Sequence, residues 1–166
     1  MTKINKVFHP KPLSILRQKA IPILPSQCRI MFQRMWRYTM NDREHAVGFA
    51  ANQLTVLGEH GKLNAFIAVI DDKWTFFGNA ELGSWNKYFN KNKYDIEGCL
   101  SIPDKFYRVK RKKKIDVTYL DKYGREQTGS FYDQEARIIQ HEMDHLNGIL
   151  IADIGKEIIN KGDNNG

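Results

Sequence analysis

Apolar residues recur at helical spacing in the first quarter of the chain. From residue 28 onward they fall at i, i+3, i+4, i+7 and i+8, which is typical of one face of an amphipathic helix. The positions are Cys28, Met31, Phe32, Met35 and Trp36. Ser26 follows Pro25 and is suited to the N-cap. The pattern predicts a helix over residues 26–41, in which Cys28 is a small core residue.

Short apolar runs bounded by turn residues predict β-strands in the middle of the chain. The predicted strands cover residues 65–70, 74–77, 114–120 and 125–131. Residues 121–124 read as a turn between the last two strands, so we expect a hairpin there.

A second helix is predicted near the C-terminus. Asp133 is suited to its N-cap, Glu135 to its first turn, and Gly148 to the left-handed position just after its end. An apolar stripe for docking on the core is formed by Ala136, Ile139, Met143 and Leu146. We therefore expect an α+β fold, with antiparallel β-sheets around this central helix and the N-terminal helix packed alongside.

Composition limits the class of protein. The 166 residues, 42% hydrophobic and 27% charged, are typical of one globular domain over residues 1–166, in which 160–166 read as a loose polar tail. No apolar run approaches the roughly 20 residues that span a bilayer. Two distant cysteines make a disulfide framework improbable and favour a reducing cytoplasm.

Positive charge is unevenly distributed along the chain. The net charge is +7, and residues 108–114 read RVKRKKK. We interpret this run first as a solvated strand edge or hairpin arm, where lysines discourage edge pairing. A contact of the basic surface with the ribosome or rRNA is the alternative.

Candidate chemistry lies on the second predicted helix, in the stretch QHEMDHLNGIL from Gln140 to Leu150. Residues His141 and His145 are four apart and differ by about 40° around the helix, so they share one face. Two imidazoles at this spacing can occupy two corners of a metal site. The adjacent Glu142 is placed to accept a proton from water. The alternative is an ordinary helix that carries H-E-x-x-H by chance.

A third ligand is needed for this metal site. The extended pattern H-E-x-x-H-x-x-G-x-x-H fails because Ile151 stands at its last position, and Glu157 is the one downstream glutamate. Upstream, Cys99 follows a glycine beside strand-like sequence and could project at the helix. A Cys-His-His set leaves a coordination position open, as catalytic sites do. The alternative is that Cys99 is a small buried residue.

Three motifs together resemble the peptide deformylase family. Residues 46–53, AVGFAANQ, are similar to its motif G-x-G-L-A-A-x-Q, with Ala46, Phe49 and Asn52 departing from the usual residues. Its E-G-C-L-S motif stands intact at residues 97–101, and Q-H-E-x-D-H at 140–145. The resemblance covers residues 7–153 and fits a short form of the family, such as a phage-encoded one.

The resemblance implies a role for each matching residue. Cys99, His141 and His145 would hold Fe(II) in the cell, with Zn, Ni or Co as substitutes. Glu142 would shuttle a proton, while the Gln53 side chain and the Leu100 N–H would stabilise the oxyanion. The residues expected to contact or organise the substrate are Val47, Gly48, Glu97 and Ile138. Gly48 would let the substrate backbone approach closely, and Ile138 would line an apolar pocket.

The implied activity is removal of the formyl group from N-formylmethionyl peptides, with release of formate. Such an enzyme would work as a monomer in the cytoplasm of a bacterium or a phage-infected host. Two alternatives stay open at this point. One is a zinc peptidase, and the other is an inactive family member that binds the ribosome or RNA.

Overall fold

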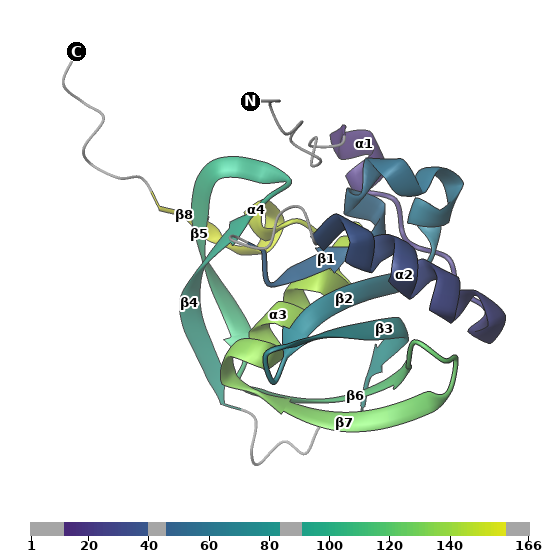
Figure 1. The fold of residues 1–166 in the computed structure, drawn as a ribbon. Helices are drawn as coiled ribbons and strands as arrows, with labels where there is room; N and C mark the ends of the chain where they lie inside the picture. The colour runs from purple at the N-terminus through teal and green to yellow at the C-terminus, as the bar shows by residue number, and fades with distance from the viewer. Residues whose placement is uncertain (1–11, 40–45, 84–90, 159–166) are drawn as a thin grey trace, which may run out of the picture.

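The computed structural model describes residues 12–39, 46–83 and 91–158 (Figure 1). The helices are α1 (Leu13–Leu16), α2 (Cys28–Thr39), α3 (Asp133–Leu146) and α4 (Ile151–Ile154), with 3-10 turns η1 (Pro25–Gln27), η2 (Ala51–Gln53) and η3 (Thr55–Lys62). The strands are β1 (Gly48–Ala50), β2 (Ala65–Ile70), β3 (Lys73–Leu82), β4 (Asn92–Cys99), β5 (Ile102–Lys112), β6 (Lys114–Leu120), β7 (Glu126–Tyr132) and β8 (Lys156–Glu157). Residues 40–41 of the predicted N-terminal helix and the tail 160–166 lie outside the described residues.

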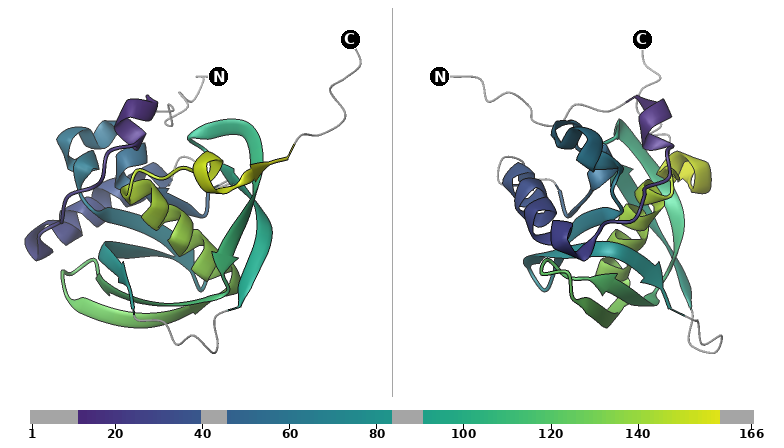
Figure 2. Two further views of the ribbon diagram at one scale, coloured as in Figure 1. Left: turned by 180° about the vertical axis from the view of Figure 1, so that it is seen from behind. Right: turned by 90° about the vertical axis from the view of Figure 1, so that its right-hand side faces the viewer.

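The strands form two antiparallel sheets. The larger sheet has the order β1-β2-β3-β6-β7, and the smaller has the order β4-β5-β8. Helix α3 runs between them, as the two views of Figure 2 show, and α2 lies on the other face of the larger sheet. The predicted α+β fold around a central H-E-x-x-H helix is therefore confirmed.

Strand β2 is the layer between the two helices. Its side chains alternate, so Phe66 and Ala68 pack in the cluster with α3, while Ala65 and Ile67 pack in the cluster with α2. All four are fully buried. Burial on both faces explains why the segment AFIAVI is a continuous apolar run without polar alternation.

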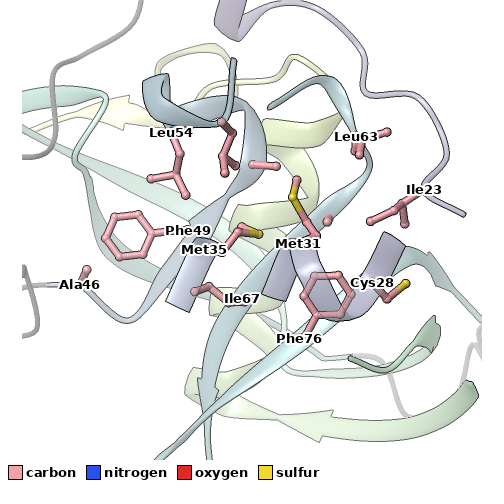
Figure 3. Packing of buried hydrophobic residues seen from close by; sticks show 13 residues of the cluster. Ile23, Cys28, Met31, Met35, Ala46, Phe49, Leu54, Leu63, Ile67 and Phe76 are labelled. Atoms are coloured by element: carbon pink, nitrogen blue, oxygen red, sulfur yellow. The ribbon is translucent and has the colours of Figure 1, made fainter. Parts of the chain in front are cut away.

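The core on the α2 side contains the predicted apolar stripe (Figure 3). Met31 and Met35 are buried, and Cys28 has no exposed surface, which confirms its assignment to the core. Trp36 lies at the edge of the stripe and is 38% exposed. The prediction of Ser26 as N-cap is wrong, because Ser26 lies inside the 3-10 turn η1 that precedes the helix.

Helix α3 begins one residue away from its predicted cap. Tyr132 is the N-cap, and Asp133 is the first helical residue, with a φ of 45°. The predicted end is confirmed, because Gly148 follows the C-cap Asn147 and has a φ of 73°. A left-handed residue at this position lets the chain leave the helix at once.

The β4–β5 hairpin contains residues 108–112 of the basic run. Strand β5 is the middle strand of its sheet, with β4 on one edge and β8 on the other. The predicted hairpin arm is confirmed, but the run is not wholly solvated. Arg111 is only 6% exposed, because its side chain points inward and pairs with the buried Glu97 and the partly buried Asp144. No helix in the described ranges is long and apolar enough to cross a membrane.

Candidate metal centre

Helix α3 and the end of strand β4 bring three metal-binding side chains together. The ligand atoms of Cys99, His141 and His145 all lie within 4.8 Å of one another. The Nε2 of His145 is 3.2 Å from the Cys99 Sγ and 3.2 Å from the His141 Nε2. Helix α3 supplies both imidazoles, which are one turn apart. Strand β4 of the smaller sheet supplies the thiol, which faces the helix.

The orientation of His141 is fixed by a carboxylate. Its Nδ1 lies 3.0 Å from Glu97 Oε2, so the Nδ1–H donates to Glu97. This hydrogen bond directs Nε2 at the other two ligand atoms. His145 is 1% exposed, and its Nδ1 has no hydrogen-bond partner among the described residues. Burial, followed by the neighbouring His141, holds the pKa of His145 well below its usual range, which keeps this ring neutral.

Glu97 is also held by two arginines. Arg111 donates from Nε and Nη2 at 2.9 and 3.0 Å, and Arg137 donates from Nη1 at 2.6 Å. Arg111 pairs in addition with Asp144 on α3. Burial raises the pKa of Glu97, but hydrogen bonds with His141 and Arg111 outweigh it and lower this pKa to about 2. Glu97 is therefore a fixed anion behind the metal ligand.

Several members of this network were assigned no role from the sequence, although Asp144 belongs to the motif at residues 140–145. Arg111 was read as part of a solvated run, and neither Arg137 nor Asp144 was assigned a role. One feature of the sequence could have indicated the role of Arg111. Side chains alternate between two faces along β5, and Arg111 falls on the inward face together with Tyr107 and Val109.

The 3-10 turn η2 places Gln53 at the metal centre. Gln53 is 4% exposed, and its Oε1 accepts a hydrogen bond of 2.8 Å from the Ala50 N–H. That bond directs the amide NH₂ inward, where Nε2 lies 3.0 Å from His145 Nε2 and donates to Ser101 Oγ at 3.1 Å. The turn thus presents a hydrogen-bond donor beside the three ligand atoms.

The carboxyl of Glu142 lies against the backbone of β1. Glu142 is 4% exposed, and burial raises its pKa to about 7. Its Oε2 has no hydrogen-bond partner within the described part of the chain. A Cβ added at Gly48 would collide with Oε1 of this carboxyl and lie 2.9 Å from its Cδ. The absence of a side chain at Gly48 therefore makes room for Glu142.

A pocket of about 180 Å³ opens onto this centre. Nine of the ten site residues predicted from the sequence line it, and His145 lies deeper, behind His141. The lining residues are Ala46, Val47, Gly48, Gln53, Ile96, Glu97, Gly98, Cys99, Leu100, Gln134, Arg137, Ile138, His141 and Glu142.

The donor set fits a divalent metal ion. One thiol and two imidazoles converge, one ring is oriented by a carboxylate, and a fourth side is open to the pocket. A buried carboxyl with an unpartnered oxygen stands beside them. The fold and this site define a metal-dependent hydrolase built on a helical H-E-x-x-H motif.

Comparison with known proteins identifies the family. Residues 1–159 match the family model described as Polypeptide deformylase. The peptide deformylase of Thermoanaerobacter pseudethanolicus is 38% identical over 148 residues, which are 84% of this chain and 82% of that protein. The chain belongs to the polypeptide deformylase family, which confirms the family indicated by the three motifs.

Other similar proteins differ in how much of their length is matched. The peptide deformylase of Synechocystis is 53% identical over 57 residues, 34% of this chain and only 30% of that protein. The crystal structure of the Thermotoga maritima peptide deformylase superposes with a TM-score of 0.75 and 26% identity, covering 89% of this chain and 97% of that one. The crystal structure of a probable peptide deformylase from Synechococcus phage S-SSM7 superposes with a TM-score of 0.73 and 25% identity. The superposition covers 89% of this chain and 99% of that one.

Proposed function

We propose that this protein removes the formyl group from N-formylmethionyl peptides and releases formate. The observation that carries the proposal is the convergence of Cys99, His141 and His145 at the end of a small pocket. Glu142 and Gln53 stand on its walls. The family of the chain supports the same reaction.

Cys99, His141 and His145 would hold the metal. We propose Fe(II) in the cell, with Zn, Ni or Co as substitutes, since thiolate and imidazole donors suit all of these ions. When bound, the ion supplies Lewis acidity, which polarises a carbonyl oxygen and makes water more acidic. Glu97 keeps the His141 ring in the tautomer that leaves Nε2 free to bind it.

Glu142 would move the proton. Its unpartnered Oε2 can accept a proton from the attacking water and pass it to the leaving amine. The Gln53 amide NH₂, directed inward by the Ala50 N–H, would donate to the oxygen of the formyl group together with the Leu100 N–H. One such donor is worth about 3 kcal/mol in the transition state.

The remaining pocket residues would select the substrate. Ile138 and Val47 offer apolar surface to an unbranched methionine side chain, and the volume of the pocket suits a single side chain. We further propose that residues 1–166 act as one catalytic domain, as a monomer in the cytoplasm. A contact of the basic surface with the ribosome, and a phage origin, stay predictions.

The zinc peptidase alternative is disfavoured by the surroundings of Ile151. This residue stands where a third histidine would be needed, and it is 2% exposed in an apolar cluster with Cys99, Tyr107 and Val109. An inactive RNA-binding protein would have no need of Glu142, whose burial costs free energy.

Formate release tests the proposal. The protein is purified without oxygen, loaded with Fe(II) and given formyl-Met-Ala-Ser, beside the variant Glu142→Ala and the surface variant Tyr123→Ser. We expect turnover by the unmodified protein and by Tyr123→Ser, and a loss of several orders of magnitude in Glu142→Ala with retained metal. A folded, metal-loaded protein that releases no formate would refute the proposed function.

A further inference from the structure

The outward face of the β4–β5 hairpin carries exposed apolar side chains. Along both strands alternate residues point inward, among them Glu97, Tyr107 and Val109, which are buried. The opposite face presents three large apolar side chains that are more than half exposed. They are Tyr94 at 55%, Ile96 at 60% and Phe106 at 51%. Exposed apolar residues that adjoin one another mark a binding surface more often than isolated ones do.

The strand register makes these side chains one continuous row. Gly98 pairs with Phe106, Ile96 with Arg108, and Tyr94 with Lys110. A Cβ at Gly98 would lie 3.1 Å from the Phe106 ring, so this ring covers the glycine. We call these six residues the hairpin row. It extends from the first to the fifth residue of a five-residue stretch in each strand, or about 14 Å.

The far end of the hairpin row is positively charged. The Arg108 guanidinium lies 5.3 Å from the centre of the Tyr94 ring, and the Lys110 Nζ lies 5.8 Å from it. Neither cation pairs with a carboxylate among the described residues, and the six outward positions include no acid. Apolar surface at one end and unneutralised charge at the other define the chemistry of a partner.

The hairpin row begins at the mouth of the candidate active site. Ile96 and Gly98 belong both to the row and to the pocket lining. The pocket suits one side chain, so the rest of a bound peptide has to leave through this mouth. Strands β1 and β4 are edge strands of their sheets, and both border the pocket. An extended peptide can add to such an edge and continue along the row.

We propose that the hairpin row binds the part of the substrate peptide beyond its N-terminal methionine. It favours peptides in which an apolar side chain is followed by acidic ones. The row accommodates about four residues of extended chain, with the apolar one nearest to Phe106 and the acidic ones beside Arg108 and Lys110. This inference rests on the proposed function and names the substrate class of the same site.

Other occupants fit the row less well. A second copy of the chain, packed row against row, would offer no acidic side chain from its row to either cation. An RNA strand would match the charge, but it would leave the aliphatic Ile96 in the middle of the row without a suitable partner. The continuity with the pocket favours the peptide.

Steady-state kinetics with matched peptides test the inference. The substrates are formyl-Met-Ala, which is too short to reach the cations, and formyl-Met-Ala-Phe-Ala-Glu-Glu beside its Lys-Lys counterpart. We expect the acidic peptide to exceed the basic one in kcat/KM on the order of tenfold at low salt, since two exposed charge contacts are reversed. High salt should reduce this ratio.

Variants test whether the side chains of the hairpin row cause the preference for the acidic peptide. Lys110→Glu should abolish or invert the ratio between acidic and basic peptides. Phe106→Ser should reduce the ratio of kcat/KM between the acidic peptide and the same peptide with Ser in place of Phe at the third position. The matched controls Lys122→Glu and Tyr123→Ser, both exposed in the β6–β7 turn, should leave both ratios unchanged. Circular dichroism confirms that each variant is folded.

Each contrary outcome has a distinct meaning. Equal kcat/KM for the acidic and basic peptides, with formyl-Met-Ala turned over, would refute the hairpin row and leave the proposed function intact. Ratios that do not respond to Lys110→Glu, together with weaker binding of poly-uridine RNA by this variant, would make the face a nucleic-acid surface. Absence of turnover with every peptide would refute the proposed function, and this inference with it.

Discussion

The substitution Gly48→Ala separates two explanations of why a glycine stands in β1. The sequence motif suggested that Gly48 allows the substrate backbone to approach. The structure shows that a methyl group there would collide with the carboxyl of Glu142 before any substrate is bound. The backbone conformation of Gly48 is accessible to alanine, because its φ is not positive. The variant should therefore fold and retain its metal.

The size of the effect follows from the displacement of Glu142. The added Cβ would lie 2.9 Å from the carboxyl carbon, whereas carbon atoms in contact are separated by about 3.5–4.0 Å, so the carboxyl has to retreat by roughly 0.6–1.1 Å. A misplacement of about 1 Å at a reacting group costs on the order of 10²-fold in rate. We expect kcat to fall by that order while KM changes little.

The assay is formate release from formyl-Met-Ala-Ser with metal content measured in parallel. The control is Gly83→Ala, where the new Cβ would lie 3.4 Å from the nearest atom and should be tolerated. A normal kcat with a raised KM in Gly48→Ala would refute this reasoning. It would assign the glycine to the substrate backbone instead.

Four further predictions concern the network, the metal and the core. Glu97→Gln removes the carboxylate that Arg137 pairs with and leaves Arg111 with Asp144 alone, so it should cost about 3–5 kcal/mol in urea unfolding of the metal-free protein; an unchanged midpoint would contradict this. Because the pKa of Glu97 lies at about 2 instead of 4.5, the metal-free protein should lose about 3 kcal/mol of stability as the pH falls from 4.5 to 2, and Glu97→Gln should not. Cys99→Ser should weaken metal binding by on the order of 10- to 100-fold or more in chelator competition, and equal affinity would exclude the thiol as ligand. Met35→Ala should cost about 2–5 kcal/mol in unfolding while kcat persists, and a kcat loss would link this core to the site.

Elements with strong local signals could be predicted from the sequence. The strands 65–70 and 114–120 have the observed bounds of β2 and β6, because apolar runs and turn residues delimit them. The predicted strand 74–77 is only the first half of β3, because the continuation to Leu82 has small or polar residues and an exposed leucine in place of a run of large apolar ones. Strand β4 was not predicted, since its residues alternate between the outward row and buried polar groups such as Glu97.

Some residues of the candidate site could likewise be predicted from local sequence, and others could not. The metal ligands and Glu142 are adjacent in sequence or belong to a motif, so residue types and spacing identify them. The role of Arg111 depends on which face of β5 is buried, and this depends on the packing of the hairpin against α3. The reason for Gly48 depends on the side chain of a residue 94 positions later. Neither can be read from local pattern.

Burial of β2 between two helices has a consequence for synthesis of the chain on the ribosome. One covering helix, α2, precedes β2 and can fold against it at once, but α3 begins 63 residues after the strand ends. At a synthesis rate of about 5–20 residues per second, the face of β2 that packs against α3 stays exposed for roughly 3–13 s before α3 is made. A run of six uncharged residues, four of them (Phe and three β-branched) of high β-propensity, is prone to aggregate during such an interval. The acidic pair Asp71 and Asp72 directly after the strand adds the charge that limits intermolecular pairing while the nascent chain is incomplete.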